Sequence, residues 1–246
     1  MGPAVPGPSG AATRGAEPAL GPEPRGDCPR CPRLVEFRET WRSRKPEWCN
    51  APVPSFGPSD ARLLIVGLAP GLQGANRTGR PFTGDYAGDL LYATLLDFGF
   101  ARGTYAARPD DGLTLLDARI TNAVRCVPPE NKPTGPEIAT CRPFLIATMA
   151  EMPRLAAVVA LGRVAHDTMI TTLGRKKSAC PFGHGAVHPC GDLTVFDSYH
   201  CSRYNTNTGV LTEKMFRDVF TAVRAHLDAA SHSSTAAALR SGGKTG

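Results

Sequence analysis

The chain has 246 residues, of which 41% are hydrophobic, and its 28 Lys and Arg against 22 Asp and Glu give a net charge of +6. This composition supports a real core in one large domain or two small ones, and the mild positive charge is compatible with a phosphate-rich partner. No apolar run approaches the length of a membrane span, and the N-terminus lacks the apolar core of a signal peptide, so we expect a cytoplasmic protein.

Both ends of the chain have compositions that do not support a packed core. Residues 1–27 are dense in Pro, Gly and Ala, and residues 231–246 are mostly small and polar. Such segments bury too little apolar surface to order themselves. We therefore expect two disordered tails around a single domain at residues 28–230, which contains no internal repeats.

The first predicted strand, at residues 63–66, runs into the glycine-rich turn GLAPG at residues 67–71. A second turn-rich segment, GRPFTGD at residues 79–85, precedes a predicted helix. Strand, glycine loop and helix in this order present an anion or a small polar ring at the carboxyl edge of a sheet. The loop has neither the P-loop nor the dinucleotide-binding pattern, so we expect no nucleotide cofactor. Its Phe82 and Asp85 suit a flat polar ring, and an ordinary turn with a buried Phe is the alternative.

Strands and helices alternate along the rest of the domain. A helix near residues 89–98 completes the first pair, and three more pairs follow: strand 118–124 with helix 137–149, strand 155–161 with helix 163–173, and strand 193–198 with helix 212–227. Because parallel crossovers each need a helix, four pairs predict a three-layer α/β/α sandwich with a central four-stranded, mainly parallel sheet. Such sheets bind ligands outside the carboxyl ends of their strands, where Asn122, Gly162 and His200 are found.

Four of the eight cysteines form two pairs. Cys28 and Cys31 are a CxxC directly before a predicted helix, and Cys126 and Cys141 flank a proline-rich loop. Because disulfide frameworks are rare in the cytosol, metal ligation is the first explanation. An all-cysteine set with one wide gap favours an iron–sulfur cluster over zinc, which more often uses two tight CxxC pairs. Four unrelated core cysteines are the remaining alternative.

Three segments nearer the C-terminus add candidate ligands. The CPFGHGAVHPC stretch at residues 180–190 has donors that suit zinc, but its glycines and prolines favour a mobile loop that contacts substrate. The basic run at residues 174–177 is well placed to meet a phosphate backbone. The HCSRYN segment at residues 200–205 follows the last strand, where its side chains can donate hydrogen bonds to a ligand or to phosphates.

Five features occur in order along residues 28–227: the spaced cysteines and the motifs GLAPG, GRPFTGDYAGDLL, TNAVRC and HCSRYNTNTG. Together they resemble the uracil-DNA glycosylase superfamily, and within it family 5, the iron–sulfur type of bacteria and archaea. The resemblance implies a monofunctional DNA glycosylase of base excision repair. Such an enzyme flips uracil out of double-stranded DNA and hydrolyses the N-glycosidic bond, which leaves an abasic site.

The resemblance also implies a set of site residues. Phe82 would stack on the flipped base, Asn122 would read its Watson–Crick edge, and His200 would hydrogen-bond the carbonyl where negative charge builds. The loop that carries Ser202 and Arg203 would press into the minor groove beside the lesion. The substrate-binding set that it implies is Gly67, Leu68, Ala69, Pro70, Gly71, Phe82, Asn122, Ser202 and Arg203.

The sequence departs from the superfamily at the acid that, in the best-known relatives, stabilises the sugar cation and orients water. Ala69 occupies that position beside Leu68, and neither side chain can serve. Asp85 is the family's candidate replacement, which makes Asp85 and His200 the expected catalytic pair; a helix N-cap is the alternative role for Asp85. Without a strict polar filter here, we expect the pocket to admit hypoxanthine and xanthine as well.

The remaining expectations concern the cofactor and the partners. By the resemblance, Cys28, Cys31, Cys126 and Cys141 would hold a structural [4Fe-4S] cluster, since glycoside hydrolysis needs no electron transfer. The expected partner is damaged double-stranded DNA, bound by a monomer in the cytoplasm and associated with the nucleoid. A non-catalytic iron–sulfur or zinc protein that binds nucleic acid, and a redox protein that uses the cluster, are the competing interpretations.

Overall fold

The computed structural model describes residues 21–241, and its centre is a five-stranded sheet in the order β4-β1-β5-β7-β6. The strands are β1 (Leu63–Gly67), β4 (Ala118–Asn122), β5 (Ala157–Leu161), β6 (Val187–Cys190) and β7 (Leu193–Ser198). Strands β4, β1, β5 and β7 are parallel, and β6 pairs antiparallel with β7 at one edge.

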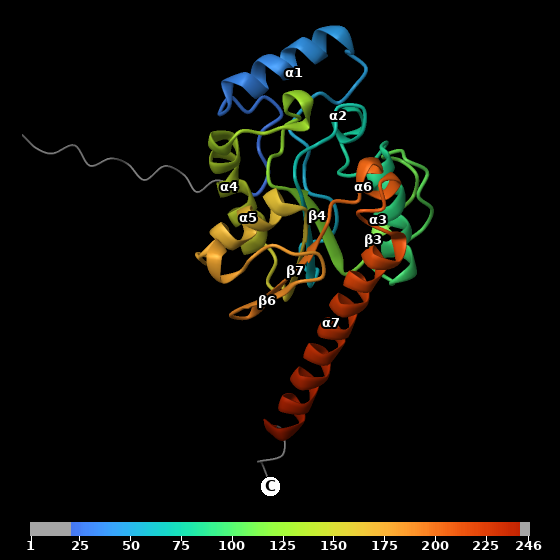
Figure 1. The fold of residues 1–246 in the computed structure, drawn as a ribbon, viewed down its shortest axis with the longest axis vertical. Coiled ribbons are helices and arrows are strands. Elements are labelled where there is room, and N and C mark those ends of the chain that lie inside the picture. Colours follow the sequence, from blue (N-terminus) through green and yellow to red (C-terminus); the bar gives the residue numbers. More distant parts are fainter. Residues whose placement is uncertain (1–20, 242–246) are drawn as a thin grey trace, which may run out of the picture.

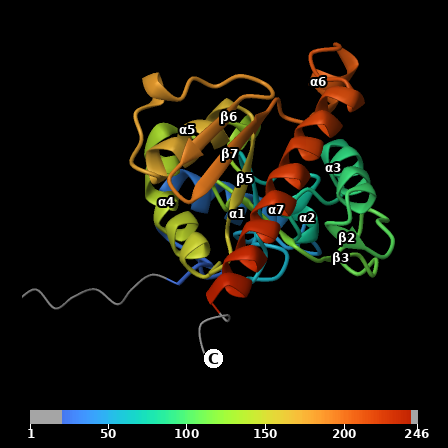
Figure 2. The ribbon, with the colours of Figure 1, turned by 90° about the horizontal axis from the view of Figure 1, so that it is seen from below.

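Helices cover both faces of this sheet, as Figures 1 and 2 show. α3 (Tyr86–Asp97) and α7 (Glu213–Ser241) lie on one face, and α4 (Gly135–Ala150) and α5 (Arg163–Thr172) lie on the other. Burial on both faces accounts for the near-continuous apolar runs of the parallel strands. The three-layer α/β/α sandwich with a mainly parallel sheet is therefore confirmed.

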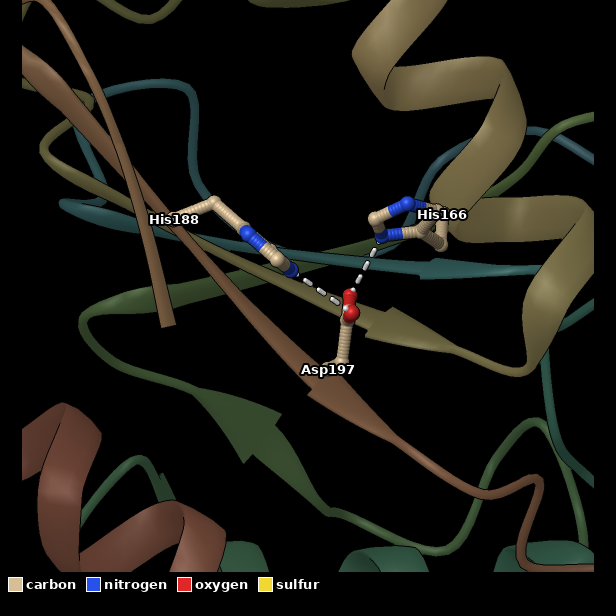
Figure 3. Close-up of side chains that lie close together, drawn as sticks. All are labelled: His166, His188 and Asp197. Carbon is tan, nitrogen blue, oxygen red and sulfur yellow. Dashed lines mark hydrogen bonds and ion pairs between the residues drawn. The ribbon is translucent and has the colours of Figure 1, made fainter. Parts of the chain in front are cut away.

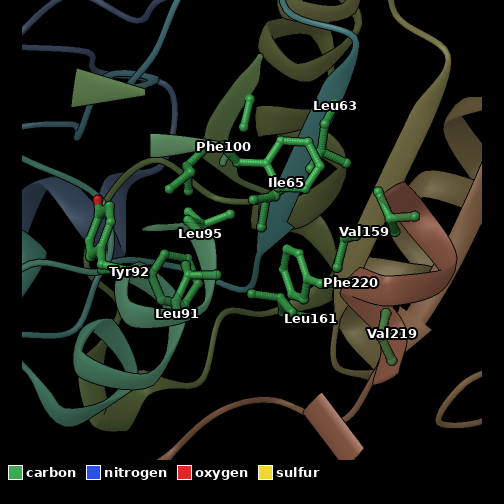
Figure 4. Close-up of a cluster of buried hydrophobic side chains, with 14 of the residues drawn as sticks. Leu63, Ile65, Leu91, Tyr92, Leu95, Phe100, Val159, Leu161, Val219 and Phe220 are labelled. Atoms are coloured by element: carbon green, nitrogen blue, oxygen red, sulfur yellow. The ribbon is translucent and has the colours of Figure 1, made fainter. Parts of the chain in front are cut away.

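Alternate residues of β1 belong to two different cores. Leu63 and Ile65 pack with aromatic and aliphatic side chains of α3 and α7, including Tyr92 and Phe220 (Figure 4). Leu64, the residue between them, packs in a second cluster with side chains of α4 and α5. The period of two along the strand thus places one hydrophobic layer on each side of the sheet.

The smaller elements frame the sheet. They are α1 (Pro32–Arg44), α2 (Ala75–Thr78), α6 (Arg203–Asn207), the hairpin strands β2 (Ala101–Arg102) and β3 (Thr114–Leu115), and the 3-10 turns η1 (Pro129–Asn131) and η2 (Lys177–Ala179). Helices α1 and α2 lie at the end of the molecule opposite the C-terminal end of α7 (Figure 1). Among residues 21–241, no helix combines the length and apolarity that a membrane crossing requires.

The sequence-based prediction of four strands was wrong by one. Residues 187–190 form the edge strand β6, where we predicted a mobile loop. Three of its four residues are not buried and one is Pro189, so the segment carries no apolar strand pattern, and its proline is tolerated because the strand lies at the edge. Helix α7 also continues to Ser241, which places the predicted tail boundary at residue 230 inside a helix.

The N-terminal segment that we predicted to be disordered makes specific contacts where the structure describes it. The Glu23 carboxylate accepts a hydrogen bond from Ser55 N at 3.1 Å and lies 2.9 Å from Nη1 of Arg125. Arg125 is only 1% exposed, so Glu23 supplies the counter-charge of a buried guanidinium. Residues 1–20 and 242–246, the remainder of that expectation about the tails, lie outside the described residues.

Candidate active site

A cavity of about 580 Å³ opens at the carboxyl ends of β1, β4 and β7. It lies at the edge of the sheet where a parallel α/β fold binds ligands. Ten of the predicted site residues line it: Leu68, Ala69, Pro70, Gly71, Phe82, Asp85, Asn122, His200, Ser202 and Arg203. The strand ends therefore bring together residues that are up to 135 positions apart in the sequence, from Leu68 to Arg203.

Gly67 lies directly behind this cavity and permits a close approach of two side chains. A Cβ at this position would lie 2.4 Å from Oδ1 of Asn122 and 2.7 Å from Cζ of Phe82. The Phe82 ring is 7% exposed, and Asn122 is 3% exposed. A flat aromatic surface and a carboxamide thus meet at one wall of the cavity because the strand ends in glycine.

The Asn122 carboxamide is held at the end of β4 without a complete set of partners. Its Oδ1 is buried and accepts no hydrogen bond from the part of the chain that the structure describes. Buried polar atoms are nearly always paired, since an unpaired one loses its hydration without compensation. Because Asn122 lines the cavity, a ligand that brings a donor would complete the hydrogen bonding of this side chain.

His200 lies beside Phe82 in the lining of the cavity. The two rings are stacked with centroids 6.0 Å apart and planes 27° apart. Burial lowers the pKa of His200 to about 4, so its imidazole is neutral at physiological pH. The backbone carbonyl of His200 accepts a hydrogen bond from Nδ2 of Asn205 at 2.8 Å, which ties the end of β7 to helix α6.

Asp85 both caps a helix and lines the cavity. It is the N-cap of α3, where its Oδ1 accepts a hydrogen bond from Gly88 N at 3.3 Å, so the alternative that we considered for it is confirmed. Its other oxygen, Oδ2, faces the glycine turn: a Cβ on Gly71 would lie 2.9 Å from it and one on Gly74 only 2.3 Å. Burial raises the pKa of Asp85, and the Gly88 hydrogen bond opposes that rise.

The segment after β7 forms the rim of the cavity. Ser202 caps the short helix α6 by accepting a hydrogen bond from Asn205 N at 3.3 Å. The Arg203 guanidinium lies 5.3 Å from the centroid of the Tyr86 ring, and Tyr204 beside it is 74% exposed. This rim combines a cation with an unusually exposed aromatic ring, as a surface that meets nucleic acid often does.

Sequence reasoning missed several lining residues, among them Gln73, Tyr86 and Asn131. Tyr86 follows Asp85 within the GRPFTGDYAGDLL motif, so its position next to a predicted site residue could have identified it as a lining residue. Asn131 ends the turn η1 and has a left-handed backbone with φ of 55°. Its approach to the cavity depends on how the proline-rich loop packs, which no local pattern gives.

The four predicted metal ligands lie together at a second, narrow cavity. Cys28, Cys31, Cys126 and Cys141 line it, and all four belong to one apolar cluster below helix α1. Burial, with the neighbouring thiols adding to it, raises the pKa of Cys126 to about 12. Burial also raises the pKa of Cys141 to about 11. The four cysteines thus lie together in the fold, as the predicted ligand set requires.

The four sulfurs form a loose group. Among the described residues, no three of them lie within 4.8 Å of one another. Arg125 N also donates a hydrogen bond to the Cys141 sulfur at 3.3 Å, which partly opposes the effect of burial on the pKa of that thiol.

His166, His188 and Asp197 form a different polar cluster beneath the sheet edge (Figure 3). Nδ1 of His166 lies 2.7 Å from Oδ1 of Asp197, and Nε2 of His188 lies 3.0 Å from Oδ2. These are hydrogen-bond lengths that use both carboxylate oxygens, whereas ligands of one tetrahedral zinc with bonds of about 2.0 Å lie about 3.3 Å apart. The cluster therefore binds α5 and β6 to β7 through hydrogen bonds.

The 180–190 segment does not match our expectation for it. Of its four candidate metal donors only His188 joins the polar cluster, and His184 instead accepts a hydrogen bond from Tyr199 N through Nδ1 at 3.1 Å. None of its residues lines the cavity of about 580 Å³. It supports the end of β7 from behind, next to His200.

Comparison with known proteins agrees with this geometry. A family model described as the uracil DNA glycosylase superfamily matches residues 54–224. A type-5 uracil-DNA glycosylase of Thermus thermophilus is 45% identical over 199 residues, which cover 78% of this chain and 90% of that protein. A type-5 enzyme of Pyrobaculum aerophilum is 41% identical over 197 residues, covering 78% and 86%. A type-4 enzyme of the same organism is 34% identical over 152 residues, covering 61% and 63%.

Proposed function

The chain belongs to the uracil-DNA glycosylase superfamily and is a DNA glycosylase, and from this premise we propose that it removes uracil from double-stranded DNA as a type-5 enzyme. It acts as a monofunctional hydrolase: it flips the base into the cavity, cleaves the N-glycosidic bond with water and leaves an abasic site for base excision repair. In this proposal it works as a monomer, in the cytoplasm and on the nucleoid.

The open acceptor on Asn122 carries this proposal. Uracil presents an N–H donor beside a carbonyl acceptor on its Watson–Crick edge, and a carboxamide offers the matching acceptor and donor. The Asn122 Oδ1 is the buried acceptor that lacks a partner, and the Phe82 ring beside it offers a face on which a flipped base can stack. Cytosine has the opposite pattern at this edge, so a carboxamide held with Oδ1 toward the base N–H would discriminate against it.

His200 stabilises the departing base. As the glycosidic bond breaks, negative charge develops on the base and on its carbonyl next to the bond. A neutral imidazole can donate a hydrogen bond to that oxygen, and its pKa of about 4 keeps it neutral over the physiological range. Its ring centroid lies 6.0 Å from that of Phe82, so a base that stacks on Phe82 would lie near the imidazole.

Asp85 acts on the sugar side of the bond. A carboxylate below an oxocarbenium-like sugar stabilises its positive charge and orients the attacking water. Its Oδ1 is engaged by Gly88 N, while Oδ2 lies against Gly71 and Gly74 at the wall of the cavity. The two glycines bring the backbone close to this oxygen, so a water held there is confined to a small volume.

A wider substrate range follows from Leu68 and Ala69, which line the cavity with apolar side chains at these two positions. A cavity of about 580 Å³ without a polar filter there has room for a purine. We therefore include hypoxanthine and xanthine among the proposed substrates. Comparable excision rates for uracil and hypoxanthine would support this extension, and no activity on either purine lesion would refute it.

The cofactor in this proposal is a [4Fe-4S] cluster held by Cys28, Cys31, Cys126 and Cys141. When bound, it supplies a covalent cross-link and no electron transfer. Cys126 is four residues after Asn122, and Cys28 and Cys31 precede helix α1, so the four thiolates fix the N-terminal segment to the loop behind the reading residue. This support is the reason for a cluster in an enzyme whose reaction is not a redox reaction.

The competing proposal is a non-catalytic iron–sulfur or zinc protein that binds nucleic acid. It shares the cysteines and the positive charge but gives no reason for an unpaired Asn122 oxygen and a neutral histidine in the lining of one cavity. A redox protein would need a second cofactor site, and the sequence contains neither of the glycine patterns that mark nucleotide-binding loops.

A single-turnover assay on duplex oligonucleotides with one uracil tests the proposal. We expect the wild type to produce abasic sites and both Asp85→Ala and His200→Ala to lose about 100-fold or more in rate. If Asp85→Ala retains most of the activity, the backbone of the glycine turn and not Asp85 orients the water. Tight binding of the lesion duplex by the wild type without cleavage would favour the non-catalytic protein.

A further inference from the structure

Phe82 has a backbone conformation that its side chain disfavours. Its φ is +52°, in the left-handed region that bulky L-residues rarely occupy. Such a conformation persists only where the surrounding structure holds it, and residues of this kind gather at functional sites. The ring at the wall of the cavity must therefore be fixed by contacts outside its own turn.

Two tyrosine hydroxyls hold the carbonyl groups on either side of this residue. Tyr92 Oη donates to Pro81 O at 2.7 Å, and Tyr105 Oη donates to Phe82 O at 3.2 Å. The two phenol rings stack with centroids 4.6 Å apart. Gly88 makes room for this arrangement, since a Cβ there would lie 1.9 Å from Phe82 O and 2.4 Å from Tyr105 Oη.

A buried ion pair fixes the two phenols in turn. Both terminal nitrogens of Arg80 donate to the Asp111 carboxylate at 2.8 Å, and its Nε donates to Thr83 Oγ1 at 2.7 Å. The guanidinium carbon lies 5.4 Å from the Tyr92 ring centroid and 5.8 Å from that of Tyr105. A planar, bidentate cation against two aromatic faces is a rigid arrangement.

We propose that Tyr105 is a positioning residue that holds Phe82 in its left-handed conformation and thereby sets where a flipped base stacks relative to His200. The inference rests on the proposed function, because it concerns the placement of the base. Tyr105 belongs to the hairpin segment at residues 101–115, which contributes no residue to the cavity lining and was not among the predicted site residues. Asp111 of the same segment accepts hydrogen bonds from Ala106 N and Leu113 N, so the segment is ordered by the same ion pair.

Tyr105→Phe tests this role because it removes one hydroxyl and keeps the ring. We expect the single-turnover rate constant for uracil release at saturating enzyme to fall about 5-fold, the effect of one lost hydrogen bond of about 1 kcal/mol, with duplex affinity unchanged. Thr114→Val is the matched control: it removes a hydroxyl that accepts from Arg102 Nε in the same hairpin, away from Phe82, and should leave the rate unchanged.

The double-mutant cycle with Phe82→Ala separates positioning from a general structural role. If Tyr105 acts through Phe82, adding Tyr105→Phe to Phe82→Ala changes the rate by less than about 2-fold. Tyr92→Phe, which removes the hydrogen bond to Pro81 O, provides a second variant with the same expected coupling should Tyr105→Phe fail to fold. A wild-type rate in Tyr105→Phe, or an undiminished 5-fold loss in the Phe82→Ala background, would overturn the inference alone. Absence of uracil release by the wild type would overturn the proposed function and the inference with it.

Discussion

Replacing Gly67 by Ala probes how tightly the two reading groups are packed at the end of β1. The added Cβ would lie 2.4 Å from Oδ1 of Asn122 and 2.7 Å from Cζ of Phe82, distances that no real contact tolerates. The backbone of Gly67 lies outside the left-handed region, so the substitution adds bulk without adding backbone strain. Displacing a packed ring and a buried carboxamide costs about 1–3 kcal/mol in stability.

The effect of Gly67→Ala on the reaction should exceed its effect on stability. A displacement of about 1 Å in a positioning group costs on the order of 100-fold in rate, so we expect uracil release in single turnover to fall about that much. Gly135→Ala is the control, because a Cβ at that helix start would meet nothing within 4 Å apart from its chain neighbours and the backbone of its own helix. It should retain full activity. Wild-type activity in Gly67→Ala would refute the close packing of the ring and the carboxamide.

Three further outcomes follow from named contacts. The folded state holds His200 neutral down to a pKa of about 4, so the unfolded state binds more protons between that value and the ordinary histidine pKa. The free energy of unfolding should therefore fall as the pH falls through this window. In urea unfolding, His200→Gln should lose less of this free energy over the same window than the wild type. Glu23→Ala leaves the buried Arg125 guanidinium without its carboxylate. In chemical denaturation it should lower the free energy of unfolding by about 1–3 kcal/mol. A wild-type value would contradict the anchoring of the N-terminal segment by Glu23. Cys141→Ser should abolish the visible absorbance of an iron–sulfur cluster and lower Tm. Cys49→Ser, at an exposed thiol outside the site, should change neither the absorbance nor Tm. An unchanged spectrum in Cys141→Ser would remove this residue from the ligand set.

The parallel core of the fold could be predicted because its physical signals are local. Continuous apolar runs at residues 63–66 and 155–161 mark strands buried on both faces, and a helix follows each of them. Strand β6 could not be predicted, because an edge strand needs few apolar residues and its pairing is decided by β7. The N-terminal anchor was missed for a related reason: Glu23 acquires its role only when Arg125 is buried next to it.

The site was predictable to the extent that it lies at strand ends. Asn122 and His200 terminate or follow parallel strands, so topology alone brings them to the same edge of the sheet. Tyr105 and Asn131 come from irregular segments, and their distance from the cavity depends on tertiary packing that no periodic pattern records. Asp85 shows that the two roles predicted for one residue do not exclude each other, since the same carboxylate caps a helix and lines the cavity.

Release of uracil from a duplex oligonucleotide by the wild type and by Asn122→Ala, measured in single turnover, tests the central claim most directly. The open acceptor on Asn122 predicts abasic-site formation by the wild type and a loss of about 100-fold or more without the carboxamide, at unchanged affinity for undamaged duplex. No abasic product from the wild type, or an undiminished rate in Asn122→Ala, would contradict the assignment of this cavity as the site that reads and releases the base.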